Sequence, residues 1–401
     1  MSIKGRTPKL GLMLAALVVT LAAVPVEALE QRTLSQRFPI TEGDTLRLAN
    51  LAGRLELEST SGSEVEVIAT IFAAGKSAGQ TEELLNSMNW VEARDRQGRR
   101  EWALSYPVDR YRTFRYPGSD ARHDDHDESF WGKLFSSFDM SRSNTRYLGE
   151  RVSVVRGGSA PTLYADLVVR FPTSGSLVVR NMVGRAYGGD LAGDLTVDTG
   201  SGSVDIDSFE GRLNVDTGSG TVKLGSVSGE LLVDTGSGSI YIDALAGSGE
   251  LDTGSGKIDV GGVDSDSLVA DTGSGSIAVR NGRVGHLIAD TGSGGIKVLD
   301  VDVEVFEADT GSGSVTLQSS LLNARDVEID TGSGSVKIYG HPSASFYLTA
   351  DQGSGSFRSG YEDAKLIMRG REVVGAERGD RKTRIRVDTG SGSCTIAPKG
   401  G

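Results

Sequence analysis

Short stretches of alternating apolar and polar residues recur through the second half of the chain. Leu213 and Val215 flank one polar residue, a polar segment follows, and Val222 and Leu224 then resume the alternation. The pattern returns in the following units with other aliphatic residues in the same places. A period of two is typical of a β-strand with one buried face. Each unit therefore predicts two strands of about four residues.

The polar segment between the two strands is the pentapeptide D-T-G-S-G. It begins at Asp198, Asp216, Asp234, Asp252, Asp271, Asp290, Asp309, Asp330 and Asp388, and a variant, D-Q-G-S-G, begins at Asp351. The spacing grows from 18 to 21 residues along the series, and the last gap is 37 residues. Because that gap is close to two periods, we expect one unit there that lacks the motif.

Two arrangements of the repeat fit this spacing. The two strands of a unit could pair as an antiparallel hairpin, or each unit could be one coil of a parallel β-solenoid. A constant corner beside a second corner of variable length favours the solenoid, since equivalent corners then stack on one edge. The sequence thus predicts an all-β fold, a parallel β-solenoid or β-helix-like array with coils of about 18–21 residues. A short helix and an irregular loop are expected in the N-terminal half.

The motif residues have a structural interpretation. Glycine would supply positive φ at the corner, and aspartate would accept hydrogen bonds from the corner amides in an Asx-type turn. Threonine and serine hydroxyls would bond to backbone groups or to their counterparts one coil away. The segment Leu232–Ser237 also matches the local signature of pepsin-like aspartic proteases. Such enzymes need two carboxylates that share a proton, whereas ten stacked copies would form a column, so we do not expect protease activity.

Calcium binding is an open alternative for the same aspartates. Carboxylates stacked about 4.8 Å apart repel each other, and hard cations such as Ca²⁺ could relieve that repulsion. The units do not follow the nine-residue Gly-Gly-x-Gly-x-Asp pattern of known calcium repeats.

The N-terminal half contains a weaker form of the pattern. Alternation begins at Leu46, so we expect the array to start near residue 40. A short helix is predicted over residues 80–89 with Thr81 as a candidate N-cap, and strands over 90–95, 100–106, 163–171 and 177–180. These elements suit a capping region at one end of the array.

Residues 107–159 interrupt the pattern and predict an irregular, mobile insertion. The segment His123–Glu128 (H-D-D-H-D-E) could bind a transition metal weakly, although a solvated loop is the simpler interpretation. Five apolar residues follow at roughly helical spacing and predict a short amphipathic helix that packs on the array, a membrane or a partner. These residues are Phe130, Trp131, Leu134, Phe135 and Phe138. His286 and His341 are isolated, and Cys394 takes the place of a buried aliphatic residue.

The first residues resemble a secretory signal peptide. Lys4, Arg6 and Lys9 precede an apolar run from Leu10 to Val24, and small residues precede a predicted cleavage after Ala28. A retained membrane anchor is the alternative, but the run is short for a membrane span. No later segment is apolar enough to cross a bilayer. We therefore expect an exported protein in the periplasm, at the cell surface or outside the cell.

Composition and charge exclude several function classes. The 401 residues include 55 Gly, 9 Pro and 1 Cys, which excludes collagen, an internal disulfide framework and cysteine-rich metal sites. The net charge of −12 argues against a general nucleic-acid binder. No spacing in the sequence indicates a nucleophile–base pair, a phosphate-binding loop or a dinucleotide fingerprint.

The repeats resemble the bacterial putative-adhesin family, a β-strand-repeat domain of unknown function. The pattern L-x-V-D-T-G-S-G-S-V-x-I carries the resemblance, together with the entry segment Leu167–Arg180, in which a strand and a proline precede the first repeat. The resemblance covers residues 160–400 well and 40–105 weakly. It implies an exported β-solenoid-like protein and brings no catalytic residues.

Together these features predict four segments: a signal peptide (1–28), an N-terminal β region (29–106), an insertion (107–159) and the β-repeat domain (160–401). We predict a non-enzymatic structural or adhesive role in the cell envelope, with a glycan or protein ligand at the surface. No catalytic, cofactor-binding or metal-binding residues and no cofactor are expected. A carbohydrate-active β-helix enzyme and a Ca²⁺-dependent repeat protein are the alternatives, and two carboxylates about 5–10 Å apart in a groove would favour the enzyme.

Overall fold

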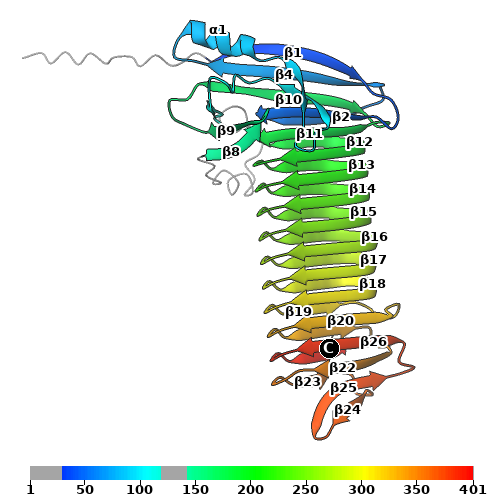
Figure 1. Cartoon of the computed structure of the whole chain (residues 1–401). Helices are drawn as coiled ribbons and strands as arrows, with labels where there is room; N and C mark the ends of the chain where they lie inside the picture. The colour runs from blue at the N-terminus through cyan, green and yellow to red at the C-terminus, as the bar shows by residue number, and fades with distance from the viewer. Residues whose placement is uncertain (1–28, 119–141, 401) are drawn as a thin grey trace, which may run out of the picture.

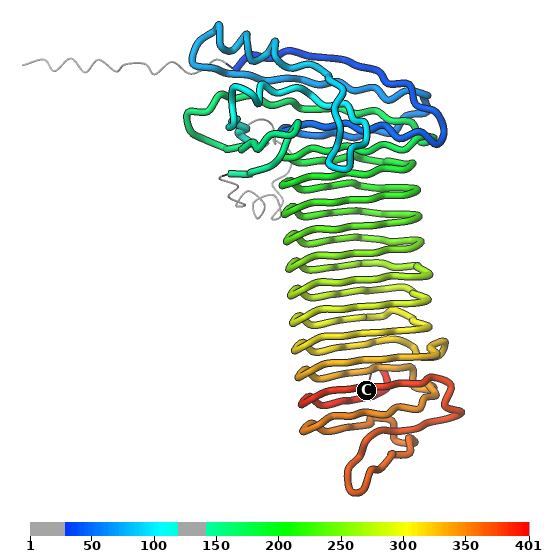
Figure 2. Tube along the Cα trace, in the orientation of Figure 1, coloured from blue at the N-terminus to red at the C-terminus, as the bar shows by residue number. Residues whose placement is uncertain are grey.

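The computed structural model describes residues 29–118 and 142–400. The chain forms a long stack of coils with a wider region at its N-terminal end (Figure 1). We call the wider region the head (residues 29–118 and 142–185) and the stack the shaft (residues 186–398 without the hairpin 365–378). The trace in Figure 2 shows that successive coils of the shaft lie parallel to one another.

Seven long strands build the upper shaft, and each crosses both of its faces. They are β12 (Ala186–Thr199), β13 (Val204–Thr217), β14 (Val222–Thr235), β15 (Ile240–Thr253), β16 (Ile258–Thr272), β17 (Ile277–Thr291) and β18 (Ile296–Thr310). Each strand ends at a motif threonine, and the Gly-Ser-Gly corner then leads to the next strand. We call the face formed by the second half of each strand, which contains the motif aspartate and threonine, the motif face.

Neighbouring strands pair in parallel with equivalent residues in register. Asp216 lies beside Asp234, and Thr217 lies beside Thr235. Strands therefore pair between units and not within a unit, which confirms the predicted solenoid and shows that the hairpin alternative is wrong.

The lower shaft consists of shorter strands in the same two faces. They are β19 (Val315–Gln318), β20 (Asp326–Thr331), β21 (Val336–Gly340), β22 (Phe346–Asp351), β23 (Phe357–Ser359), β26 (Thr383–Thr389) and β27 (Cys394–Pro398). On the motif face β26 lies between β20 and β22, so Asp388 is next to both Asp330 and Asp351. On the opposite face β27 lies between β21 and β23. The coil of β26 and β27 is the last in the sequence. It is inserted between the coil of β20 and β21 and the coil of β22 and β23.

The 37-residue gap does not contain the expected motif-free coil, so that prediction is wrong. It contains a hairpin of β24 (Lys365–Arg369) and β25 (Glu372–Arg378). Strand β25 pairs antiparallel with β22 and so covers the last rung of the motif face.

The head joins the shaft through a similar exchange of strand order. Its strands are β1 (Glu30–Pro39), β2 (Thr45–Ala52), β3 (Leu55–Thr60), β4 (Glu64–Ala74), β5 (Trp90–Arg94), β6 (Arg100–Leu104), β7 (Thr113–Arg115), β8 (Arg142–Tyr147), β9 (Glu150–Val155), β10 (Thr162–Pro172) and β11 (Ser176–Val183). Strand β3 lies between β10 and β12, and β2 lies between β6 and β11. Strands β1, β4 and β10 continue antiparallel above them. Segments that are more than a hundred residues apart therefore share the same sheets.

The helix of the described residues, α1 (Ala78–Ser87), begins two residues earlier than predicted. Its N-cap is Ser77, whose hydroxyl accepts a hydrogen bond from the Gln80 amide at 3.3 Å. Thr81 is buried within the first turn, where its hydroxyl accepts a hydrogen bond from the Gly75 amide at 2.9 Å. Thr81 is therefore not the cap, although it contributes to the chain reversal before the helix.

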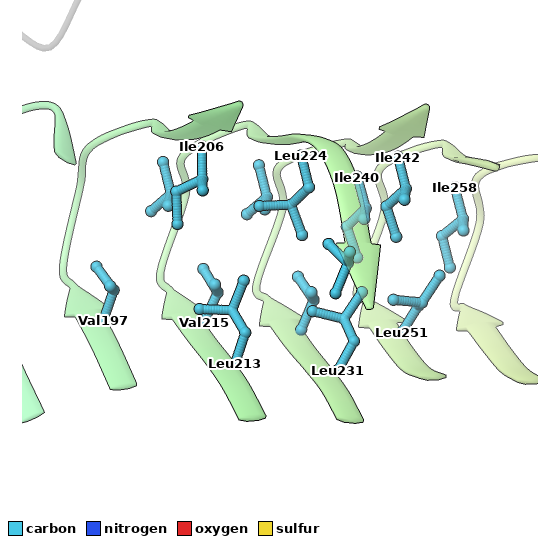
Figure 3. Packing of buried hydrophobic residues seen from close by; sticks show 14 of the residues in the cluster. Val197, Ile206, Leu213, Val215, Leu224, Leu231, Ile240, Ile242, Leu251 and Ile258 are labelled. Atoms are coloured by element: carbon cyan, nitrogen blue, oxygen red, sulfur yellow. The ribbon is translucent and has the colours of Figure 1, made fainter. Parts of the chain in front are cut away.

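The core of the shaft is a double row of aliphatic side chains. Figure 3 shows Ile206, Leu224, Ile242 and Ile258 along one face and residues such as Val215 and Leu251 along the motif face. All of these side chains are at most 2% exposed. Burying a valine, leucine or isoleucine side chain contributes about 1.5–3 kcal/mol, and no single coil can bury its own row without neighbours on both sides.

Candidate functional site

The motif threonines form a buried column along the shaft. Thr217, Thr235 and Thr253 are fully buried, and each side-chain oxygen serves two corners. The Thr253 hydroxyl accepts a hydrogen bond from the Gly256 amide at 3.1 Å and donates to the Gly238 carbonyl of the preceding corner at 2.7 Å. Threonine thus closes its own corner and ties it to the neighbouring corner.

The threonine column is closed at both ends by amide side chains. Asn181 and Asn50 continue it into the head, where the Asn50 side-chain amide donates to the Asn181 side-chain oxygen at 3.0 Å. The Tyr106 hydroxyl donates a hydrogen bond to the side-chain oxygen of Asn50 at 3.0 Å. At the lower end Gln352 follows Asp351, and its side-chain amide donates to the Val373 carbonyl of the hairpin at 2.8 Å. At the head the Asn181 amide donates to the Gly53 carbonyl at 2.7 Å, whereas at the lower end the Gln352 side chain ties the column to the hairpin.

The motif aspartates point outward and do not make the predicted Asx turns. Among the described residues, no motif aspartate accepts a hydrogen bond from a corner amide, because the threonine side chain takes that position. Partial burial, followed by the charges of neighbouring aspartates, raises the pKa of Asp252 and Asp290 above the ordinary value of 3.8. Burial and the charges of neighbouring aspartates also raise the pKa of Asp216 and of Asp330.

An arginine stands at each end of the aspartate column. Arg180 is in register with Asp198 at the head, and it is ion-paired with the buried Glu101 at 3.1 Å. Arg369 of the hairpin lies 3.8 Å from Asp351 at the other end. Burial raises the pKa of Glu101 and of Asp198, and the positive charge of Arg180 opposes both shifts. Each arginine thus places a positive charge beside the last aspartate of the column.

The corner glycines are required by close approach between coils. A Cβ atom at Gly256 would lie 1.8 Å from the Gly238 carbonyl oxygen. The positive φ that we predicted for the motif occurs at Gly353 of the variant copy, with φ of 47°, but not at the D-T-G-S-G glycines. It recurs at the second corner, for example at Gly229 with φ of 126°. Glycine is required at both corners, but for different reasons. At the motif corner a Cβ would collide with the preceding coil, and at the second corner the backbone adopts a positive φ.

The motif face has a shallow depression that the sequence analysis missed. In the inward leucine column, Gly249 stands between Leu231 and Leu268, and a depression of about 380 Å³ lies over this part of the face. Leu232 and Val269 line it, and Leu232 is 39% exposed. Ile288 follows Val269 in the same outward column, and Glu250 lies between Val269 and Leu232.

Two carboxylates, Glu230 and Glu250, line the depression. The Glu230 side chain is 63% exposed and bound to Arg212 at 2.7 Å. A catalytic proton donor is usually shielded from water and from positive charge, and Glu230 is shielded from neither.

No group of three or more His, Cys, Asp or Glu side chains that could hold a metal ion occurs in residues 29–118 and 142–400. His286 contacts Glu307 at 3.0 Å, and His341 accepts a hydrogen bond from the Ser343 amide. Cys394 is fully buried opposite Val336, and burial raises the pKa of its thiol to about 12. The predicted signal peptide, the His123–Glu128 cluster and the apolar residues from Phe130 to Phe138 lie outside the described residues.

Within the described part of the chain, no helix has the length and apolar character needed to cross a membrane.

The repeat geometry agrees with a comparison against protein-family models, in which residues 244–397 match the family described as Toastrack DUF4097. The matched segment begins within β15 and includes the inserted coil and the terminal hairpin. The match confirms the resemblance predicted from the repeats.

A comparison with solved structures finds similar chains at low identity and low TM-score. A putative lipid binding protein from Parabacteroides distasonis is 13% identical, with 90% of this chain and 96% of that chain covered and a TM-score of 0.35. A putative adhesin from the same organism is 10% identical, with 92% and 97% covered and a TM-score of 0.30. A putative adhesin from Bacteroides fragilis is 8% identical, with 92% and 97% covered and a TM-score of 0.25. A comparison with curated proteins finds no match.

Proposed function

We propose that this chain is an exported, non-enzymatic rod of the cell envelope that binds a protein ligand on the motif face of its shaft. The proposal rests on a group of apolar side chains on this face. Leu232 is exposed and lines the depression with the half-buried Val269, and the half-buried Ile288 lies beside Val269. An exposed apolar patch within a charged surface is typical of an interaction site.

The surroundings of these apolar side chains define the chemistry of the ligand. Residues 198–340 contain 23 Asp and Glu but only 8 Lys and Arg, so this part of the shaft has a net charge of −15. A ligand segment that combines aliphatic and positively charged side chains is complementary to such a surface. The outward positions of the motif face between residues 212 and 330 contain no Phe, Tyr or Trp on which a sugar ring could stack. These features favour a protein over a glycan.

A peptide selection tests this binding face. The chain from residue 29 onward is immobilised and used to select from a random peptide library, with a glycan array probed in parallel. We expect the selected peptides to combine Lys or Arg with Leu, Ile or Val, and the glycan array to show no binding. The double variant Leu232→Ser/Val269→Ser should bind these peptides at least about tenfold more weakly.

The matched control is Leu322→Ser, because Leu322 is 40% exposed and lies away from the depression. It should bind the peptides like the unmodified chain. Peptides that bind the double variant equally well, or a positive glycan array, would contradict the proposed face. Release of reducing sugars from a polysaccharide would favour the enzyme alternative.

Export is tested separately with a reporter. Residues 1–40 are fused to an alkaline phosphatase that is active only outside the cytoplasm. We expect phosphatase activity in intact cells and a mature N-terminus at Leu29. Activity that depends on cell lysis would contradict export.

A further inference from the structure

The hairpin of β24 and β25 forms the lower end of the molecule (Figure 1). We call it the tip hairpin. Among the described strands, β24 pairs only with β25, so its outer edge is free. Leu366 is 47% exposed and Met368 is 53% exposed, more than the other large apolar side chains of the described residues. The fold thus places its two most exposed large apolar side chains on a free edge strand at one end of a rod.

Positive charge accompanies these apolar side chains. Lys365 and Arg369 flank them on β24, with 81% and 69% of their side chains exposed, and Arg371 follows in the turn. Arg371 makes no ion pair in the described part of the chain, and the nearest carboxylate to Arg369 is 3.8 Å away. The tip therefore has cationic groups that are only partly compensated.

The distribution of charge along the molecule separates the tip from the shaft. Residues 365–378 of the tip hairpin contain 4 Lys and Arg and 2 Asp and Glu, a net charge of +2, whereas residues 198–340 of the shaft have a net charge of −15. An anionic surface would attract the tip and repel the shaft. The rod would therefore approach such a surface with one end and not with the side of its shaft.

We propose that the tip hairpin docks on an anionic lipid surface, with Leu366 and Met368 inserted at the interface and Arg369 and Arg371 beside the lipid phosphates. Insertion of apolar side chains together with contacts from cationic groups is the combination that gives reversible interfacial binding. Strand β24 is exposed along most of its length on both faces, which suits a wedge that enters an interface. A protein partner, including the acidic shaft of a second copy, would instead be expected to match a flat surface, and it is an outcome of the test.

Vesicle sedimentation tests the proposal with the chain from residue 29 onward. The probes are vesicles of equal parts phosphatidylglycerol and phosphatidylcholine, and vesicles of phosphatidylcholine alone. We expect at least about tenfold more protein bound to the anionic vesicles, and a loss of most of that binding at high salt. The variants Leu366→Ser/Met368→Ser and Arg369→Gln/Arg371→Gln should each reduce binding by about tenfold or more.

The control variant is Leu232→Ser/Leu322→Ser, which removes two exposed leucines from other parts of the molecule and should bind like the unmodified chain. Thermal unfolding of each variant verifies that it is folded. Equal binding to both kinds of vesicle, no binding to either, or unchanged binding by the tip variants would overturn the proposal. Sedimentation of the free protein as an oligomer that the tip variants dissociate would assign the tip to a second copy and would also overturn it.

Discussion

The threonine and the aspartate of each motif are adjacent in sequence but face opposite sides of the sheet. Threonine points inward and makes the hydrogen bonds that close the corner, while aspartate points outward into a row of like charges. Alternation along a strand imposes this division, because successive side chains point to opposite faces. The sequence alone gave both residues a plausible hydrogen-bonding role, and only the side-chain direction separates them.

The first prediction concerns the threonine column. Thr253→Val keeps the shape of the side chain but leaves the Gly256 amide and the Gly238 carbonyl without their partner. Unpaired buried polar groups cost about 1–3 kcal/mol each, so we expect a loss of about 2–4 kcal/mol in the free energy of unfolding, measured with urea. Thr316→Val on the outward side of β19 is the control and should change stability by less than about 0.5 kcal/mol. Equal effects of the two substitutions would show that the buried hydroxyls contribute little.

The second prediction concerns the aspartate column. In Asp252→Asn/Asp290→Asn, each substitution removes repulsion from the two neighbouring rungs. Directly opposed like charges on a sheet cost a few tenths to about 1 kcal/mol per pair, so we expect a gain of about 1–2 kcal/mol at pH 7.

The pH dependence of this gain follows from the direction of the pKa shifts. Because the pKa of Asp252 and Asp290 is raised in the folded chain, their ionisation destabilises the fold above that pKa. Protonation relieves the penalty as the pH falls toward the unfolded value of 3.8, so the advantage of the variant should shrink on acidification. The control Asp264→Asn removes the partner of Arg283, 2.7 Å away, and should give no gain at pH 7. A gain that does not change with pH would count against charge repulsion.

At the scale of the elements, the repeat predicts strands and corners well because the same physical constraint acts in every unit. The alternating aliphatic residues define the buried face, and the invariant corner stacks on itself. The start of the helix in the head is harder to predict, because Ser77 and Thr81 both have a hydroxyl that could cap it. In the structure Ser77 is the N-cap, and Thr81 is buried. The depression near Gly249 depends on the shape of the folded surface, which an alternation pattern does not register.

The third prediction addresses the motif corner. Gly256→Ala places a Cβ against a backbone carbonyl that cannot move without disturbing the next coil. We expect a loss of at least about 3 kcal/mol in the free energy of unfolding. Gly262→Ala is the matched control, because its Cβ would lie 3.4 Å from the nearest atom, and it should change stability by less than about 1 kcal/mol. A small effect at Gly256 would mean that the coils are farther apart than the structure shows.

At the scale of the whole molecule, both ends of the shaft are closed by strands that are out of sequence order. Strand β3 lies between β10 and β12 at the head, and β26 lies between β20 and β22 at the tip. The sequence could not predict this order, because the motif at Asp388 fits next to any other copy of the motif. The 37-residue gap gave the only signal, and it was equally compatible with an extra coil.

The inserted coil gives the most direct test of the column arrangement. In a Cys394→Val background, spin labels are attached to cysteines that replace pairs of outward aspartates, and dipolar broadening is measured by electron paramagnetic resonance. Asp330 and Asp388 are one rung apart, about 4.8 Å, whereas Asp330 and Asp351 are two rungs apart. We predict stronger broadening for the 330/388 pair than for the 330/351 pair. Stronger broadening for the 330/351 pair would contradict the inserted coil, and the absence of broadening in both would contradict the stacked column itself.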